Sequence, residues 1–439
     1  MTERPLTGRI RPGEAPPDRE AYERAGGYQA LRRALLHMTP EEVVGDVTTS
    51  GLRGRGGAGF GTGQKWSFVP KPRSGQRRYL IANADEMEPG TFKDRLLLEG
   101  DPHQMVEAII VSAYALAATD AYIFVRGEYK LAIARLTQAI GEATAAGYLG
   151  TDILGSGYAL ALHLHASAGR YICGEETALL TALEGRRALP RSKPPFPQVS
   201  GLWGAPSVVN NVETLCNVPH IVNNGPDWFK GLGIGPDGGT KLYGVSGRVK
   251  RPGAWELPIG TKLREILEEH AGGMQDGYQV RALLPGGAST GFLGADQLDI
   301  AMDYGSVEKA GSRLGTGTAI VLDDRACPVG MIRNLEHFFA QESCGWCTPC
   351  RDGLPWVERM LQALEDGDGE DEDLHQLERH VGLLGMGRTF CAHAPGAMAP
   401  LGSGLQKFGR EFAQHVHQHR CPWPAAGVPR ARGALQGTA

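Results

Sequence analysis

The sequence lacks the segments with which a chain crosses or enters a membrane. Its longest apolar run, Ala108 to Ala118, is too short to span a bilayer and predicts a buried helix instead. The first twenty residues contain Arg, Pro and Glu but no apolar stretch of the kind found in secretory signals. We therefore expect a cytoplasmic protein with no direct membrane insertion.

Excess positive charge and a disulfide framework are also missing. The formal net charge is −4, so no basic field favours nucleic acid or anionic lipid as a partner. Eight cysteines in 439 residues do not form a small secreted disulfide scaffold. Glycine, in contrast, is abundant at 62 residues, and 41% of the chain is hydrophobic. This combination indicates loops that approach ligands closely rather than disorder.

Apolar strands alternate with helices between about residues 28 and 235. The pattern predicts strands at 78–82, 121–126 and 158–166, and helices at 41–49, 129–146 and 175–184. Such alternation favours an α/β fold with layered helices and sheet.

Two regions of different texture follow. From about residue 240 to 325, a hairpin, one helix and further short strands predict a small β-grasp module. Beyond 328 the pattern is helical, with helices expected at 331–340, 354–364, 374–384 and 405–417. Four helices with short connections predict a bundle.

The most informative motif is Cys344-Gly-Trp-Cys347-Thr-Pro-Cys350, which is followed about 40 residues later by Cys391. Three cysteines at successive x2 spacings with a distant fourth are typical of [4Fe–4S] clusters. Structural zinc more often uses two separated C-x2-C pairs, so zinc is the less favoured alternative, beside unligated core thiols. The motif predicts a protein that moves electrons.

A glycine-rich stretch from Gly51 to Gly63 includes Arg53 and Arg55 and is followed by Lys65. It follows a helical stretch, and no carboxylate lies at the expected offset, which argues against a standard Rossmann turn. Its glycines permit close backbone approach and its cations suit a phosphate. A flexible surface loop is the alternative interpretation.

Polar segments also occur where predicted strands end. Residues 83–90 contain three carboxylates that can accept hydrogen bonds from sugar or ribityl hydroxyl groups. Residues 171–177 open a helix, so their two glutamates either contact a ligand or cap the helix. Five prolines between 187 and 206 surround Phe196 and predict a stiff pocket lip, and Asn210-Asn211 supplies amides for a polar ring edge.

Taken in this order, six motifs resemble the NADH-binding flavoprotein subunit of respiratory complex I. They are GLRGRGGAGF, NADEMEPGTFKDR, YICGEETAL, KPPFP, NNVETL and ESCGWCTPCR, and the resemblance runs from about residue 28 to 410. Related diaphorase subunits of NAD-linked hydrogenases and formate dehydrogenases share these motifs.

The resemblance implies three domains. A Rossmann-like FMN- and NADH-binding domain is expected at 28–238, a ubiquitin-like β-grasp domain at 239–327, and a four-helix bundle with one [4Fe–4S] cluster at 328–421. Residues 1–27 and 422–439 are expected to be flexible.

The resemblance also implies site residues, carried over position by position. FMN is expected to contact the glycine loop and the polar strand ends, the phenylalanines to stack on the nucleotide, and Glu88, Glu175 and Glu176 to contact NADH. No acid or base is expected, and Glu88 and Glu176 are positioning residues. The predicted cofactor-binding set is Gly54, Arg55, Gly56, Gly57, Gly59, Phe60, Lys65, Phe68, Asn83, Asp85, Glu86, Glu88, Tyr171, Gly174, Glu175, Glu176, Phe196, Asn210 and Asn211. The predicted cluster ligands are Cys344, Cys347, Cys350 and Cys391.

The expected function follows from electron counting. Hydride carries two electrons and an iron–sulfur cluster accepts one, so a flavin is needed between them. The resemblance implies an NADH:quinone oxidoreductase subunit that passes electrons from NADH through FMN and the cluster toward quinone. The implied partners are a [2Fe–2S] subunit and a large multi-cluster iron–sulfur subunit, at the inner face of the cell membrane.

Two alternatives remain. Hydrogenase and formate dehydrogenase diaphorases commonly carry an N-terminal [2Fe–2S] domain, whereas this chain has no cysteine before Cys173, which favours complex I. A zinc-stabilised binding or scaffold module is the alternative from a different class, and it predicts a colourless protein. The pattern assigns no role to Cys216, Cys327 or Cys421. His415, His417 and His419 could bind a metal, since His415 and His419 are four positions apart on a helix, but a surface terminal helix is the favoured interpretation.

Overall fold

The computed structural model describes residues 3–423, and the first of its two sheets is fully parallel. In sheet order its strands are β3 (Ala161–Ala166), β2 (Asp120–Val125), β1 (Tyr79–Ala84) and β4 (Ser207–Asn211). β1 pairs with β2 on one side and with β4 on the other, so the direction of strand addition reverses between β1 and β4. In open α/β sheets such a reversal opens a crevice at the carboxyl ends of the strands.

Both faces of this sheet are covered, as the alternation of side chains along β1 requires. Leu80 and Ala82 join the larger apolar core, whereas Tyr79 and Ile81 face α8 (Glu176–Leu183). The larger core surrounds α6 (Pro102–Ala115), which is buried along nearly its whole length. The buried helix predicted from the apolar run at 108–118 is therefore confirmed.

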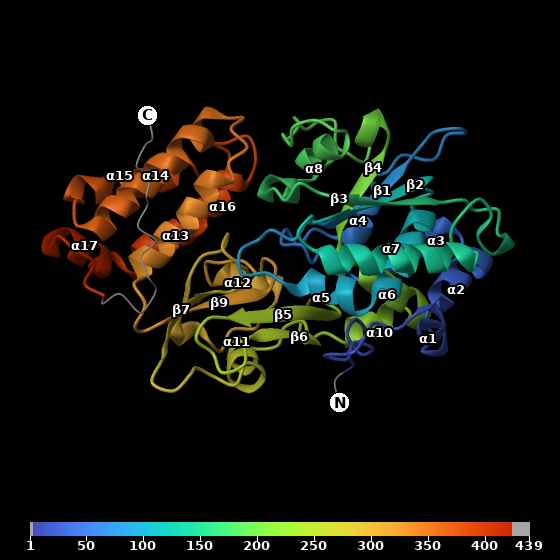
Figure 1. Cartoon of the computed structure of the whole chain (residues 1–439), viewed down its shortest axis with the longest axis horizontal. Helices are drawn as coiled ribbons and strands as arrows, with labels where there is room; N and C mark the ends of the chain where they lie inside the picture. Colours follow the sequence, from blue (N-terminus) through green and yellow to red (C-terminus); the bar gives the residue numbers. More distant parts are fainter. Residues whose placement is uncertain (1–2, 424–439) are drawn as a thin grey trace, which may run out of the picture.

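The remaining helices of this part cover the sheet and the core around α6 (Figure 1). The strands and helices predicted between residues 41 and 184 are all present, with ends shifted by a few residues. The bounds of these helices are α1 (Arg19–Arg24), α2 (Gln29–His37), α3 (Pro40–Thr49), α4 (Thr62–Ser67), α5 (Lys93–Gly100), α7 (Lys130–Ala145), α9 (Val212–Asn224) and α10 (Pro226–Gly231).

A second, mixed sheet follows α10 and has its own apolar core. In sheet order its strands are β6 (Gly253–Pro258), β5 (Thr240–Ser246), β9 (Thr318–Asp323), β7 (Val280–Leu284) and β8 (Leu293–Gly294). β5 and β9 run parallel, and the other pairs are antiparallel. Its helices are α11 (Leu263–Glu265), which a wider turn extends to His270, and α12 (Tyr304–Lys309).

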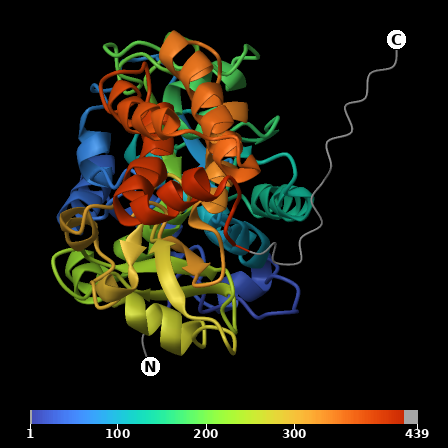
Figure 2. The same ribbon diagram turned by 90° about the vertical axis from the view of Figure 1, so that its left-hand side faces the viewer.

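The C-terminal part of the described chain is helical and packs above the second sheet (Figure 2). It contains α13 (Pro328–Gln341), α14 (Thr348–Asp366), α15 (Asp371–Leu383), α16 (His393–Lys407) and α17 (Gly409–Gln418). The prediction of four helices was wrong by one, because the segment expected as one helix at 405–417 breaks at Phe408 between α16 and α17. Prolines and glycines in α16, a composition unfavourable to helices, hid its pattern in the sequence.

The N-terminal segment is not the flexible arm that the sequence suggested for 1–27. Leu6 is fully buried, and its backbone N–H donates to Glu256 at 3.0 Å. The Tyr22 hydroxyl donates to Glu107 of α6 at 2.6 Å. Buried carboxylates such as these need partners, and the segment provides them.

Two sequence expectations concern the ends of the chain and the membrane. The expected flexible tail, 422–439, lies outside the described residues except for 422 and 423. Within residues 3–423, no helix combines the length and the apolar character needed to cross a bilayer.

Candidate active site

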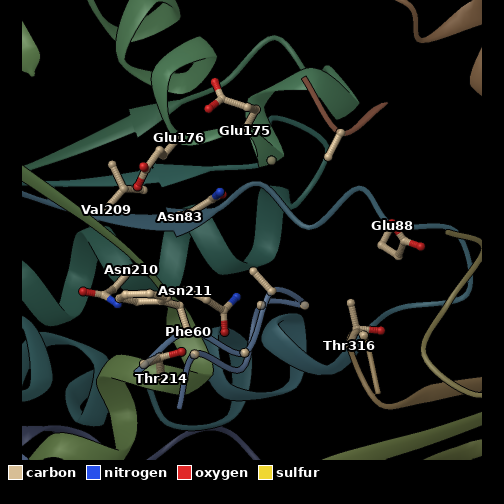
Figure 3. Close-up of a pocket in the computed structure, with 18 of the residues that line it drawn as sticks. Phe60, Asn83, Glu88, Glu175, Glu176, Val209, Asn210, Asn211, Thr214 and Thr316 are labelled. Carbon is tan, nitrogen blue, oxygen red and sulfur yellow. The ribbon is translucent and has the colours of Figure 1, made fainter. Parts of the chain in front are cut away.

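A cavity of about 600 Å³ lies at the carboxyl ends of β1 and β4, where the strand order reverses. Its volume falls in the range of ordinary cofactor sites. The parallel sheet, the second sheet and the segment at the start of α16 all contribute to the wall, and Figure 3 shows how side chains from these segments face one space. Every predicted cofactor-binding residue lines this cavity except Arg55.

The glycine loop forms one wall and is held in place from behind. A Cβ added at Gly56 would approach the Asn211 side chain to 2.9 Å, and one at Gly59 would enter the Tyr304 ring. The Tyr304 hydroxyl donates to the Gly54 carbonyl at 2.8 Å, and the Arg53 guanidinium lies over the Tyr304 ring. The loop is therefore packed against its surroundings, in contrast to the alternative of a flexible surface loop.

Arg55 corrects the predicted set, because its side chain points into the protein rather than into the cavity. It is 1% exposed, and its guanidinium donates to the Gly238 carbonyl at 2.9 Å. Its backbone N–H donates to the Thr214 hydroxyl at 2.8 Å. Arg55 thus ties the loop to α9 and to the segment before β5, and its charge lies behind the wall.

The carboxylates after β1 are buried and their pKa values are perturbed. Burial raises the pKa of Asp85 to about 6, although Ser167 donates to its Oδ1 at 2.9 Å. Within the described chain its Oδ2 has no hydrogen-bond partner. Burial, with the neighbouring Asp94 charge, raises the pKa of Glu86 to about 7. Asp85 therefore presents an unsatisfied acceptor beside the cavity.

A buried network that the sequence did not reveal supports the opposite wall. The Lys93 ammonium lies 2.7 Å from both Asp94 and Glu213 and is 1% exposed. Burial alone would lower its pKa, but the two carboxylates raise it above its usual range. Asn211 donates to Asp94 Oδ2 at 2.6 Å, and Trp66 donates to Asn210 Oδ1 at 2.9 Å. These contacts fix the two amides at the end of β4.

Glu175 and Glu176 have different surroundings although they are adjacent. Glu175 is the N-cap of α8 and accepts the backbone N–H groups of Thr177 and Ala178, each at 2.9 Å. Glu176 accepts from Lys65 at 2.5 Å and from Lys193 at 3.2 Å. Burial opposes its ionisation, yet these two ammonium groups lower its pKa below the ordinary value. The helix-cap alternative therefore applies to Glu175.

Glu88 connects the first sheet to the rest of the protein. Its Oε2 accepts from the Tyr171 hydroxyl at 2.7 Å, and its Oε1 accepts from the Ser289 N–H at 2.6 Å. Burial raises its pKa. The Tyr171 ring packs edge-on against His393 at 5.4 Å, two residues beyond Cys391. One chain of contacts thus runs from the cavity wall to the cysteine set.

The three predicted aromatic residues lie at the open side of the cavity. Phe60, Phe68 and Phe196 are each about half exposed, at 48%, 52% and 54%. The Phe60 and Phe68 ring centroids lie 6.2 Å apart. Exposed phenylalanines around a pocket mouth provide flat apolar surfaces for a planar ring.

The four predicted cluster ligands come together at the end of the α13–α14 hairpin. Burial raises the pKa of Cys350 to about 12, and the thiols of Cys347, Cys391 and Cys344 contribute to that increase. Four thiols gathered at one point supply the soft ligands that a metal cluster needs.

Cys391 also lines the cavity, together with Ala392 and His393. The cysteine set and the cavity are therefore neighbours. Trp346, inside the cysteine loop, is 54% exposed and packs against Phe390 at 6.2 Å.

The sequence analysis missed the wall that the second sheet supplies. Gly-rich turns at 286–287 and 315–317 were a signal for this wall, because glycines there permit close approach to a ligand. Lys93 and Lys193 had no such signal, because Lys93 also depends on Glu213 of the later helix α9 and Lys193 depends on Glu176 of the earlier helix α8. The wall residues contributed by the second sheet are Gly286, Ser289, Arg313, Gly315 and Thr316.

The residues present fit a flavin nucleotide and a cubane cluster. The glycine cradle leaves room beside backbone N–H groups, Asp85 keeps an acceptor without a partner, and four thiols supply soft ligands. Fold and site together define an iron–sulfur flavoprotein.

Family models match the three parts of the chain. Residues 47–220 match the Nuo51 FMN-binding domain, 242–293 match the SLBB domain, and 330–415 match the NADH-ubiquinone oxidoreductase-F iron–sulfur binding region. The chain is 56% identical over 414 residues to the F subunit of NADH-quinone oxidoreductase of Escherichia coli (strain K12), and the match covers 94% of this chain and 93% of the relative. The corresponding F subunit of Mycobacterium tuberculosis (strain CDC 1551 / Oshkosh) is 47% identical, and the match covers 92% of this chain and 91% of that relative. The chain belongs to the family of NADH-quinone oxidoreductase F subunits, which confirms the resemblance seen in the motifs.

A solved structure shares the fold. The NAD⁺-reducing [NiFe]-hydrogenase in the H₂-reduced state aligns with a TM-score of 0.80 and 34% identity. The alignment covers 90% of this chain and 65% of the hydrogenase chain, so this chain spans just under two thirds of that protein's length. The likeness supports an α/β fold with a parallel sheet and a helical C-terminal part.

Proposed function

We propose that this chain is the NADH dehydrogenase subunit of a complex I-type NADH:quinone oxidoreductase. The single observation that carries the proposal is that Cys391 and the glycine loop line the same cavity. A two-electron donor bound in that cavity is thereby placed beside a one-electron acceptor. When bound, FMN supplies the step between the two, because a flavin accepts hydride and releases single electrons.

We assign the phosphate end of FMN to the glycine loop. Gly54, Gly56 and Gly57 line the cavity. The Gly54 N–H already donates to the Phe60 carbonyl at 2.8 Å, so the phosphate is assigned to the N–H groups of Gly56 and Gly57. Lys65 lies close by, but its ammonium is engaged by Glu176 and by the Val209 carbonyl at 2.8 Å. In this proposal the positive charge of Lys65 both neutralises Glu176 and attracts the nearby phosphate.

We assign the ring and its hydroxyl-bearing chain to the ends of β1 and β4. Asp85 and Asn83 lie at one strand end, and Asn210 and Asn211 at the other. Carboxylate and amide oxygens there accept from hydroxyl groups, and amide N–H groups donate to polar ring edges.

We assign NADH to the side of the cavity opposite the proposed flavin position, between Glu88, Glu176 and the three phenylalanines. Binding energy at these residues orients the nicotinamide relative to the flavin, and orientation is the main catalytic contribution in hydride transfer. Glu88 and Glu176 remain positioning residues, as expected. The wall formed by the second sheet limits the access of water to the reacting rings from that side.

The resemblance and the comparisons also motivate proposals about layout and assembly. We retain the expected division at 28–238, 239–327 and 328–421, with Rossmann-like, β-grasp and cluster-binding parts. The relatives are named as F subunits of NADH-quinone oxidoreductases, which supports membership of this chain in a multisubunit complex. We infer that electrons leave through a [2Fe–2S] subunit and a multi-cluster subunit, in a peripheral arm at the cytoplasmic face.

A diaphorase role in a hydrogenase is the second candidate, motivated by the likeness to the NAD⁺-reducing [NiFe]-hydrogenase. Identity falls from 56% to 34% between the two comparisons. Coverage of the relative falls from 93% to 65%. Both differences favour the quinone-linked assignment.

The proposal is tested with the purified single chain loaded with FMN and its cluster. We expect NADH-dependent reduction of ferricyanide, because a small acceptor reaches the cluster or the flavin directly. We expect no inhibitor-sensitive reduction of ubiquinone or menaquinone, because the four-cysteine set is the only cluster motif in the sequence. Quinone turnover by the single chain that rotenone or piericidin inhibits would contradict the subunit assignment.

A further inference from the structure

A second group of metal-ligating side chains lies in the helical part, away from the cavity. Cys327 precedes α13, Glu365 lies near the end of α14, His415 is on α17, and Cys421 follows that helix. One ligand atom from each residue lies within 4.8 Å of all the others. These residues come from four separate segments, so the fold rather than a local motif brings them together.

The distances within this group approach those of a tetrahedral site. Cys327 Sγ lies 3.1 Å from Glu365 Oε1 and 3.4 Å from His415 Nε2. His415 Nε2 lies 3.0 Å from the same Glu365 oxygen. Around a zinc ion with sulfur at about 2.3 Å and nitrogen or oxygen at about 2.0 Å, neighbouring ligand atoms lie roughly 3.3–3.8 Å apart. Cys327, Glu365 and His415 need shifts of only a few tenths of an ångström to admit the ion, and the ligand atom of Cys421 lies within 4.8 Å of theirs.

The outer contacts of the group orient its ligands. His415 is fully buried, and its Nδ1 lies 2.7 Å from the Glu411 carbonyl. A carbonyl only accepts, so Nδ1 carries the proton and donates, and the lone pair of Nε2 faces the group. The Trp423 indole stacks on the imidazole at 5.7 Å and 16°. Metal-binding histidines are held in this way by a carbonyl on the other ring nitrogen.

Cys327 has a similar outer contact. It is the N-cap of α13, and its sulfur accepts the Gly330 N–H at 3.2 Å. Burial and the Glu365 charge raise the pKa of the Cys327 thiol, and the N–H donor of Gly330 opposes this by favouring the thiolate, which is the form that binds metals.

The group is separate from the predicted iron–sulfur ligands. Cys327 and Cys344 flank opposite ends of α13, which has 14 residues and a length of about 20 Å at 1.5 Å per residue. Glu365 and Cys350 likewise lie near opposite ends of α14. One hairpin thus carries two thiol-containing groups, one at each end.

We propose that Cys327, Glu365, His415 and Cys421 bind one zinc ion. Two thiolates, one imidazole and one carboxylate match the ligand preference of zinc, and four protein ligands leave no open position. The site is therefore structural. It joins α17 and the segment after it to the α13–α14 hairpin, and it takes no part in electron transfer.

The test measures metals in the full-length chain with its flavin and cluster, grown with zinc supplied and washed with a chelator. We expect about one zinc per chain in addition to the cluster iron. In a Cys327→Ser/Cys421→Ser variant we expect zinc to fall at least tenfold, with flavin and iron per chain unchanged. His417→Ala is the matched control and keeps its zinc, because His417 lies on the same helix with its side chain 69% exposed.

X-ray absorption at the zinc edge of the wild-type protein provides a second measurement that does not depend on a variant. We expect two sulfur neighbours at about 2.3 Å and two nitrogen or oxygen neighbours at about 2.0–2.1 Å. This measurement decides the question if the double variant loses flavin and has therefore misfolded.

Three results would overturn the proposal. The first is wild-type protein without zinc above the chelator-washed background. The second is zinc that disappears with Cys350→Ser but persists in the Cys327→Ser/Cys421→Ser variant, because that zinc would occupy the cluster site. The third is a Cys327–Cys421 disulfide, seen as two thiols that resist alkylation until reduction.

Discussion

The two ends of the α13–α14 hairpin differ in how their thiols are assembled. At one end, Cys344, Cys347 and Cys350 come from a single loop, and Cys391 completes the set. At the other end, Cys327 precedes α13 and Cys421 follows α17, and His415 on α17 and Glu365 near the end of α14 join them. The first set is recognisable from local spacing, whereas the second exists only after folding.

The difference in assembly accompanies a difference in surroundings. The loop set borders the cavity through Cys391 and contacts its wall through His393 and Tyr171. The folded set lies beneath Trp423, whose ring is covered in turn by Arg281 of β7, and none of its four residues lines the cavity. We therefore expect changes at the first end to stop electron flow and changes at the second end to affect stability.

The largest expected effect is that of Cys350→Ser. A serine hydroxyl is a poor replacement for a thiolate ligand, so the cluster is lost while FMN stays bound in its own cavity. In the assembled complex we expect NADH:quinone turnover to be abolished and the cluster's EPR signal to disappear. Flavin fluorescence after denaturation measures the FMN that remains.

The matched control is Cys421→Ser at the other end of the hairpin. It should retain the cluster signal and quinone turnover while lowering the thermal transition of the chain. The comparison fails if both variants lose electron transfer equally, or if Cys350→Ser leaves the EPR signal intact.

A smaller effect is expected at the cavity wall, with Glu176→Ala. Glu176 holds two ammonium groups, and a carboxylate beside the adenosine ribose disfavours a 2′-phosphate. Its removal leaves Lys65 without a carboxylate partner and able to attract that phosphate, whereas Lys193 keeps its contact with Glu175 at 2.9 Å. We expect kcat/KM for NADPH relative to NADH to rise about 10-fold, which corresponds to about 1.4 kcal/mol.

Glu175→Ala separates cofactor contact from helix capping. Glu175 caps α8, so its removal should lower stability by about 0.5–2 kcal/mol and change the NADPH to NADH ratio less. If the two alanine variants shift the ratio equally, Glu176 has no specific contact with the nucleotide. Activity with both nucleotides, measured with ferricyanide, provides the ratio.

The same contrast between local and assembled features explains what the sequence predicted. Strands such as β1 were predicted correctly because a short apolar run fixes a buried strand, and the glycine loop because its composition is unusual. The resemblance of the motifs to a known family predicted that residues of these segments share one cofactor site. Spacing alone predicted the loop cysteines.

What the sequence did not predict depends on distant neighbours. The side chain of Arg55 turns inward because Gly238, 183 residues later, accepts its hydrogen bond. His415 was expected on a surface helix, but it is fully buried because Trp423 and Glu365 cover it. α16 was missed because its prolines and glycines lower helix propensity, and tertiary packing overrides this propensity.

The smallest expected effect is a pH dependence of stability. It arises from Glu86 in the cavity wall and not from either group of thiols. Glu86 accepts from the Asp94 N–H at 2.8 Å and from the Tyr129 hydroxyl at 3.0 Å, and its pKa is about 7 in the folded protein. Because this value lies above the ordinary 4.5, the folded state holds the proton more tightly than the unfolded state. The stabilisation from Glu86 is therefore complete below about pH 4.5 and is lost as the pH rises through about 7.

Glu86→Gln removes this titration and should flatten the dependence. Between pH 5 and pH 7.5 we expect the melting temperature of the wild-type flavoprotein to fall more than that of Glu86→Gln, by a difference on the order of a few degrees. Cys421→Ser, measured in parallel, should follow the wild-type slope from a lower starting temperature, because its change lies at the far end of the hairpin. Parallel curves for wild type and Glu86→Gln would show that the Glu86 carboxyl does not titrate in this window, and that Asp94 and Tyr129 hold it in a single charge state.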